Sequence, residues 1–207
     1  MPATLEDFFM VDVKSGASWE PAQWSSPCQD TTVILAVDVD YQGAGGVAAG
    51  VLLRNWSDAV AAREIVVRIP AVAEYVPGEF FRRELPCIEA VLKEVREPLE
   101  CIVVDGYVTL GDPPRDGLGA ALWNKLERAV PVVGVAKTKY LGVPLEAFLF
   151  RGGSSRPLFV TAAGMTCDEA KRRVLSMAGK HRLPDMLKHV DGVARRGMGS
   201  DPARAAG

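Results

Sequence analysis

Features typical of membrane, secreted and thiolate-metal proteins are absent from this sequence. It has no apolar run of about 18 residues, the length that a membrane-spanning helix needs. Its first residues, MPATLEDFFMVDVK, lack the basic and then apolar order of a secretory signal. The four cysteines (Cys28, Cys87, Cys101 and Cys167) include no C-x-x-C pair, which disfavours a zinc or redox site and favours buried, reduced thiols. We therefore expect a cytoplasmic protein that binds no metal through cysteine.

Strong positive charge is absent as well. The formal net charge is −2, which argues against a protein that coats nucleic acid through bulk electrostatics. Within residues 168–196, however, eight Lys or Arg residues stand against four Asp or Glu, a surplus that suits a surface facing phosphates. A solvated helix face followed by a basic tail explains the same surplus, and charge alone favours this simpler interpretation.

The size of the chain predicts one domain. With 207 residues, of which 48% are hydrophobic, the chain is long enough to bury a single core. We predict one domain over residues 1–207. Residues 1–30 would be an N-terminal extension, most simply a helix packed on the sheet, and residues from about 197 to 207 a disordered tail.

The first hydrophobic segments predict an antiparallel sheet and then a helix. Residues 33–41 and 47–55 have the composition of buried strands and are joined by the Gly-rich turn QGAGG, so they predict a β-hairpin. Residues 63–70 predict a third strand, ended by Pro70. An amphipathic helix follows and runs to about residue 97. Its apolar positions recur at spacings of four and three: Phe81, Leu85, Ile88, Leu92 and Val95.

After this helix, the predicted order is strand, helix, strand, hairpin and helix: residues 100–106, 117–129, 131–137, 146–152 with 157–164, and 166–179. The first three of these segments alternate like a parallel β-α-β unit. Thr166 is the expected cap of the last helix, with Glu169 three residues later. The pattern predicts a mixed α/β sheet flanked by helices.

The first predicted strand carries two acids, Asp38 and Asp40, where a hydrophobic pair is expected. Residues two apart on a strand face the same side. Parallel pairing with residues 100–106 would bring Asp105 beside Asp38, and Glu84 lies at the edge of the core-facing stripe of its helix. Such a group of carboxylates stays ionised only beside a cation, and oxygen ligands favour Mg²⁺ or Mn²⁺. The pattern indicates a divalent-metal site, although an acid at a strand end is more often a cap or surface residue.

Five segments occur in the order, and near the spacing, of the blocks that define the endonuclease V family: AVDVDY, YVPGEFFRRELP, IVVDG, PVVGVAK and HRLPDMLKHVD. From about Val33 to Asp191, the chain resembles these nucleases, which act on inosine-containing strands. The resemblance implies an RNase H-like fold, in which three antiparallel strands are followed by β-α-β units. It also implies cleavage of the second phosphodiester 3′ to a deaminated purine in DNA or RNA, for repair or RNA processing. The cofactor would be Mg²⁺, with Mn²⁺ as a substitute, and the products a 3′ hydroxyl and a 5′ phosphate.

The same resemblance implies roles for individual residues. Asp38, Glu84 and Asp105 match the acids that bind the metal. Lys137 matches the active-site lysine, and its ammonium would stabilise charge on the phosphoryl oxygens. Its simpler interpretation is a strand-end lysine that reaches solvent.

A fourth metal neighbour is less closely defined. Asp191 falls where the family places a further acid or histidine, but MLKH before it departs from the family pattern. Asp185 or His189 is the alternative neighbour, and Asp40 either joins the site or lies just outside it.

Base recognition is also assigned by resemblance. In the family, a wedge fills the gap that the displaced base leaves, and here Tyr75 would stack in that gap while Pro77 and Gly78 fix the turn. Without the resemblance, Tyr75 would be interpreted as a loop aromatic packed on the surface. The backbone of five positions would line a hypoxanthine pocket: Gly78, Phe80, Gly106, Gly117 and Leu118.

The segment after Asp105 departs from the family. YVTLGDPPRDGLGAALW replaces a stretch that carries two family histidines, with Asp112 or the inserted proline in place of one and Ala121 in place of the other. Metal-dependent cleavage is therefore better supported than inosine specificity. The alternatives are a nucleic-acid-binding protein with altered catalysis and a nuclease with relaxed base specificity. A phosphate loop at QGAGGVAAG is disfavoured, because its spacing fits neither G-x-G-x-x-G nor the P-loop.

Overall fold

The structure is a computed structural model, and it describes residues 32–73 and 80–197. The strands are β1 (Val33–Gln42), β2 (Gly45–Leu53), β3 (Arg63–Ile69), β4 (Leu99–Val104), β5 (Thr109–Leu110), β6 (Arg115–Asp116), β7 (Val132–Ala136), β8 (Phe148–Leu149) and β9 (Leu158–Ala163). The helices are α1 (Phe80–Leu92), α2 (Leu118–Lys125), α3 (Cys167–Ser176) and α4 (Asp185–Gly197), with a short 3₁₀ helix, η1 (Leu145–Ala147).

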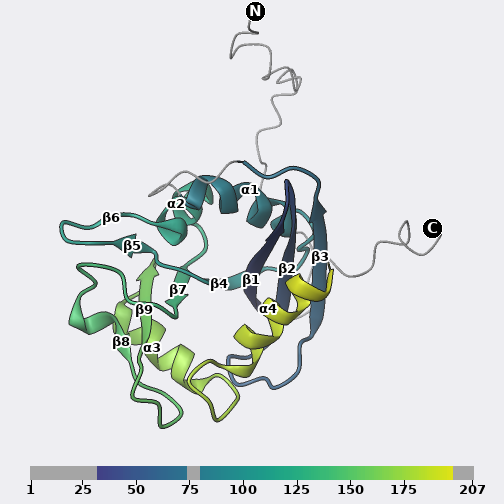
Figure 1. The fold of residues 1–207 in the computed structure, drawn as a ribbon. Helices are drawn as coiled ribbons and strands as arrows, with labels where there is room; N and C mark the ends of the chain where they lie inside the picture. Colours follow the sequence, from purple (N-terminus) through teal and green to yellow (C-terminus); the bar gives the residue numbers. More distant parts are fainter. Residues whose placement is uncertain (1–31, 74–79, 198–207) are drawn as a thin grey trace, which may run out of the picture. The chain divides into compact units, whose positions relative to one another are not determined.

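Seven strands form one mixed sheet in the order β3-β2-β1-β4-β7-β9-β8 (Figure 1). β1, β2 and β3 are antiparallel neighbours, and β4 and β7 continue the sheet parallel to β1. β9 runs antiparallel to β7, and β8 runs antiparallel to β9. The predicted hairpin between β1 and β2 turns at Gly43, whose φ of +58° favours glycine. This topology confirms the predicted three antiparallel strands followed by parallel β-α-β units.

Each face of the sheet is covered by two helices, as the alternation of side chains along the strands requires. On β1, Ile34 and Ala36 face the core under α3 and α4, whereas Leu35 and Val37 face the core under α1 and α2. All four side chains are buried. Both faces being covered explains why β1 is apolar at nearly every position before its acids.

Two predicted helices end earlier than expected. α1 ends at Leu92 and not near residue 97, because the Val95 N–H bonds to the Leu92 carbonyl in a tighter turn and Pro98 disfavours helical backbone at the residue before it. α2 ends at Lys125 and not at residue 129, because Glu127 and Arg128 have positive φ angles of 52° and 65°.

The helix α4 and the small hairpin of β5 and β6 were not predicted. α4 packs on β1 and β2 through an apolar stripe of Met186, Val190, Val193 and Ala194, all buried. None of the described helices is long and apolar enough to cross a membrane.

Much of the positive charge of residues 168–196 is neutralised locally. Lys171 Nζ lies 2.8 Å from Asp168 Oδ1, and Arg173 pairs with both Glu169 (2.7 Å) and Glu100 (2.5 Å). These pairs favour the simpler interpretation of a solvated helix face for α3. The predicted extension over residues 1–30 lies outside the described residues, as does the predicted tail from about 197 to 207 except for its first residue.

Candidate active site

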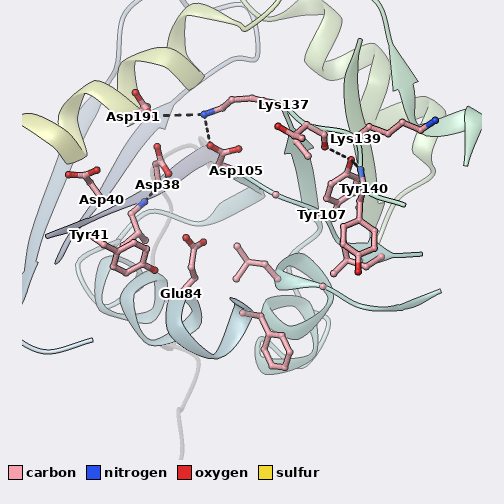
Figure 2. A pocket seen from close by; sticks show the side chains of 18 of the residues that line it. Asp38, Asp40, Tyr41, Glu84, Asp105, Tyr107, Lys137, Lys139, Tyr140 and Asp191 are labelled. Carbon is pink, nitrogen blue, oxygen red and sulfur yellow. Dashed lines mark hydrogen bonds and ion pairs between the residues drawn. The ribbon is translucent and has the colours of Figure 1, made fainter. Parts of the chain in front are cut away.

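A pocket of about 740 Å³ lies where β4 and β7 end, beside the second half of β1. Residues that follow neighbouring parallel strands emerge at the same edge of a sheet. Asp105 follows β4 directly, and Lys137 follows β7 directly. The register that pairs Val37 with Val104 places Asp38 beside Asp105. The neighbouring acids that parallel pairing predicted therefore stand in one pocket (Figure 2).

Two helices on opposite faces of the sheet supply the remaining acids. Glu84 comes from the second turn of α1, and Asp191 comes from the middle of α4. Both line the pocket, as does Asp40 two residues after Asp38. Figure 2 shows these carboxylates gathered on one side of the pocket.

An alternating chain of charges connects β4, β7 and α4. Lys137 Nζ lies 2.6 Å from Asp105 Oδ2 and 3.9 Å from Asp191 Oδ1. Asp191 Oδ1 in turn accepts a hydrogen bond of 3.0 Å from Arg195, which also lines the pocket. Partial burial opposes the charged form of Lys137, but the hydrogen bond to Asp105 and the nearby carboxylates outweigh burial, so the pKa of Lys137 lies above its ordinary value. Lys137 is therefore an ammonium at neutral pH.

Two carboxyl groups of the pocket resist ionisation. Burial and the negative charge of Asp105 raise the pKa of Asp38 to about 7, although the Val39 N–H donates to its Oδ1 at 2.9 Å. Burial, followed by the charges of Asp38 and Asp105, raises the pKa of Glu84 to about 8. Glu84 is only 7% exposed. Carboxylates that burial and mutual repulsion keep partly protonated are the groups that a cation would ionise.

The chemistry of these donors fits a hard divalent cation. All five acids of the pocket offer oxygen ligands, which suit Mg²⁺ or Mn²⁺, and the buried Glu84 forms no ion pair with Lys137. Among the described residues, however, no three Asp, Glu, His or Cys side chains form a ready-made cluster for one ion. The pocket therefore contains suitable oxygen ligands, but in the described residues they are not yet arranged as a complete coordination shell around one ion.

The alternatives to Asp191 lie elsewhere. His189 Nε2 is 2.6 Å from Glu64 Oε1 on β3, and Asp185 at the start of α4 packs against Gly179. Neither residue lines the pocket.

Some residues predicted for base recognition line the same pocket. Gly106, Gly117 and Leu118 do so, and Gly117 cannot carry a side chain, because an added Cβ would lie 2.6 Å from the Tyr107 carbonyl oxygen. Phe80 begins α1, but its side chain lies outside the description. The predicted wedge residues Tyr75, Pro77 and Gly78 lie outside the described residues.

The segment that departs from the family forms another wall of the pocket. Within it, Tyr107 and Leu110 line the pocket, together with Lys139 and Tyr140 from the connection after β7. The Tyr107 hydroxyl donates to the Thr138 carbonyl at 2.8 Å and accepts from the Tyr140 N–H at 3.1 Å. Lys139 was expected from the sequence to contact phosphate, whereas Tyr107, Leu110 and Tyr140 were not predicted. Tyr107 and Tyr140 each follow a strand end by three or four residues, a position from which side chains reach the edge of the sheet.

Comparisons with known proteins agree with this arrangement. The sequence profile of the endonuclease V family matches residues 21–151. Endonuclease V of Azotobacter vinelandii is 30% identical over 189 residues, which cover 81% of this chain and 84% of that protein. The crystal structure of endonuclease V from Streptomyces avermitilis is 28% identical, with a TM-score of 0.63 and 84% of each chain covered.

A second solved structure is less similar in sequence. Endonuclease V of Ciona intestinalis, crystallised with a 23mer DNA that contains an inosine followed by a ribo-adenosine, is 16% identical with a TM-score of 0.63. The alignment covers 80% of this chain and 84% of that chain. Together, the solved structures confirm the predicted RNase H-like fold.

Proposed function

The chain belongs to the endonuclease V family, and we propose that it is a metal-dependent endonuclease acting on strands that contain a deaminated purine such as inosine. It would cleave the second phosphodiester 3′ to that base and leave a 3′ hydroxyl and a 5′ phosphate. The observation that carries this proposal is the meeting of Asp38, Glu84 and Asp105 in one pocket with Lys137. The inosine-containing DNA bound by the Ciona intestinalis relative supports the choice of substrate.

Asp38, Glu84, Asp105 and Asp191 would hold Mg²⁺ or Mn²⁺. Such an ion, when bound, polarises a phosphate and lowers the pKa of bound water. Without a cation, these carboxylates would repel a phosphodiester, because both partners are negative. The raised pKa values of Asp38 and Glu84 support this assignment, since they show two groups whose charge the protein alone does not stabilise.

Lys137 would stabilise the negative charge that develops on the phosphoryl oxygens during cleavage. Its ammonium is already oriented by Asp105 at 2.6 Å, so little rearrangement is needed to present it to the substrate. A group that is charged and held before the substrate arrives contributes most to a transition state.

The deaminated base would lie against the backbone of Gly106, Gly117 and Leu118, with Tyr75, Pro77 and Gly78 filling the gap in the strand. Gly117 lies so close to the Tyr107 backbone that an added Cβ would come within 2.6 Å of the carbonyl oxygen, which supports a slot with a backbone-lined wall. Such a slot can read the edge of a displaced base through backbone groups.

One observation favours a second candidate function, a nuclease with relaxed base specificity or a nucleic-acid-binding protein with altered catalysis. The β5–β6 hairpin and Ala121 stand in the segment where the family carries two histidines. The acids and Lys137 remain together, so cleavage is the function that we favour.

The test uses end-labelled single-stranded DNA and RNA, each with one inosine or none, in the presence of Mg²⁺, Mn²⁺ or a chelator. We expect a nick one nucleotide beyond the inosine, lost with the chelator and in Asp105→Asn. Asp168→Asn, an exposed acid on α3, is the matched control and should nick normally.

Each other outcome selects an alternative. Nicking without preference for inosine would retain the metal site and reject the base slot. If the folded protein binds the strands but nicks none of them with either metal, the proposed nuclease activity is wrong. The DNA and RNA arms decide which backbone is the substrate.

A further inference from the structure

We propose that the side of the pocket opposite the acids is a second nucleotide-binding subsite, in which the ring of Tyr140 stacks on the unpaired base next to the cleaved phosphodiester. This inference rests on the proposed nuclease function and adds a specificity-determining residue to it. Figure 2 shows the two sides, with Asp38, Glu84 and Asp105 on one and Tyr107 and Tyr140 on the other.

Tyr140 is held in place before any ligand binds. Its N–H donates to the Tyr107 hydroxyl at 3.1 Å, and the Tyr107 hydroxyl is itself fixed on the Thr138 carbonyl. The two rings meet edge to face, with centroids 6.2 Å apart and an interplanar angle of 61°. Arg115 of β6 donates to the Tyr140 hydroxyl. A fixed aromatic ring binds a base with little loss of conformational freedom.

The same ring remains available to a ligand. Tyr140 is only half-buried, and it lines the pocket beside the exposed Thr138 and Lys139. Tyr107 packs behind it on Phe159, at 6.3 Å between ring centroids. Tyr107 therefore connects the aromatic pair to the core, and Tyr140 contributes to the pocket wall.

The position along the chain indicates which nucleotide reaches this ring. Tyr140 follows Lys137 by three residues, and Tyr107 follows Asp105 by two. Three residues span at most about 11 Å of extended chain. If Lys137 and Asp105 face the scissile phosphate, Tyr140 therefore lies within reach of an adjacent nucleotide.

Charge supports a strand on this side of the pocket. Lys139 lines the wall, with its Nζ 5.4 Å from the centre of the Phe148 ring, and Arg115 lies with its guanidinium 5.9 Å from the centre of the Tyr140 ring. An aromatic face with cations beside it is the combination that binds single strands through stacking and phosphate contacts.

The experiment measures binding, so that it does not depend on cleavage. Fluorescence anisotropy with Mg²⁺ compares Asp105→Asn protein with the same protein carrying Tyr140→Leu or Tyr140→Phe. The probes are single strands with one inosine and with an abasic site at each flanking position in turn. Phe150→Leu, an exposed aromatic outside the pocket, is the matched control.

We expect one flanking position at which loss of the base weakens binding by about tenfold in Asp105→Asn protein. Tyr140→Leu should weaken binding to the intact strand by about the same factor and remove the difference between intact and abasic strands. Tyr140→Phe should restore that difference, and Phe150→Leu should retain it. These results define a stacked base and not a loss of folding, because the intact and abasic strands are compared on one protein.

The proposed subsite is wrong if no abasic position weakens binding, or if every abasic position weakens it equally. It is also wrong if Tyr140→Leu lowers the affinity for intact and abasic strands by the same factor. Absence of binding to any strand overturns it as well. Failure of the nuclease proposal gives a different result, because a protein that never nicks can still discriminate abasic strands through Tyr140.

Discussion

The two sides of the pocket are built from different kinds of structure. The acids stand on or next to elements with a buried core: Asp38 on β1, Glu84 on α1, Asp105 after β4 and Asp191 on α4. The opposite wall stands on two-residue strands and connections, and it carries Tyr107, Leu110 and Tyr140. A register shift between β1 and β4 would separate Asp38 from Asp105, whereas the β5–β6 hairpin lies outside the seven-stranded sheet. We therefore expect the positions of the acids to be structurally fixed and the opposite wall to tolerate change.

The largest difference between the two sides should appear in neighbouring lysines. Lys137→Ala should lower kcat for nicking by about 10² to 10³ with little change in KM, because the ammonium acts on charge that develops in the transition state. Lys139→Ala, two residues away on the opposite wall, should raise KM and leave kcat within about threefold, because an exposed lysine there would contact a phosphate outside the cleaved bond. Steady-state kinetics on one inosine strand measures both. Equal losses of kcat in both variants would contradict the division of roles.

A smaller effect should appear in the stability of the metal-free protein. The pKa of Glu84 is about 8 when folded, above its ordinary value of 4.5, so between these values the folded state binds more protons than the unfolded state. The free energy of unfolding therefore falls as pH rises from about 4.5 to 8, and Glu84→Gln removes the part of this fall that Glu84 contributes, whereas Asp38, with a pKa of about 7, contributes its own part. In chelator at pH 9, Glu84→Gln should raise Tm by roughly 5 °C, and at pH 4.5 it should change Tm little.

The matched control for this prediction is Glu89→Gln, because Glu89 lies on the same helix and pairs with Lys125 at 3.3 Å on the surface. Its Tm should shift by less than about 2 °C at both pH values. Thermal unfolding monitored by circular dichroism measures all three proteins. A variant of Glu84 that is less stable than the parent at pH 9 would show that its carboxylate is not repelled in the pocket.

The smallest effect is expected on the outer face of α4. His189 is paired with Glu64 and lies outside the pocket, so His189→Gln should change the free energy of unfolding by less than about 0.5 kcal/mol. Its kcat should stay within about twofold of the parent. Urea unfolding and nicking assays measure the two quantities. A large loss of kcat with normal stability would instead make His189 part of the site.

The sequence predicts the acidic side well and the opposite wall poorly, for a physical reason. The continuous apolar run of β1 predicts a strand buried on both faces, and the helical periodicity of α1 predicts which of its faces is buried. Parallel pairing of β1 with β4 then places Asp105 beside Asp38. Tyr107 and Tyr140 meet through a hydrogen bond between two connections. No periodicity records a contact of that kind, because both partners lie outside repeating structure.

The missed helix α4 is a different case, because its signal is present in the sequence. Met186, Val190, Val193 and Ala194 repeat at the spacing of one helical face. The charged residues between these positions give the segment a basic composition, which is as typical of a solvated surface as of a helix with one buried face. The early ends of α1 and α2 depend on backbone angles after the last turn, such as the positive φ of Glu127, which apolar spacing does not encode.

The placement of Asp191 on α4 has a consequence for folding. β1 is the first described strand and α4 the last described helix, and their packing closes the longest loop between contacting elements of the described chain. Contacts so distant in sequence carry the greatest loop-closure entropy and tend to form late. Any intermediate in which α4 is undocked has a pocket that lacks the Asp191 carboxylate and its bond to Arg195. The pocket is therefore complete only when folding is complete, and a chain in which α4 has not yet docked lacks part of the site.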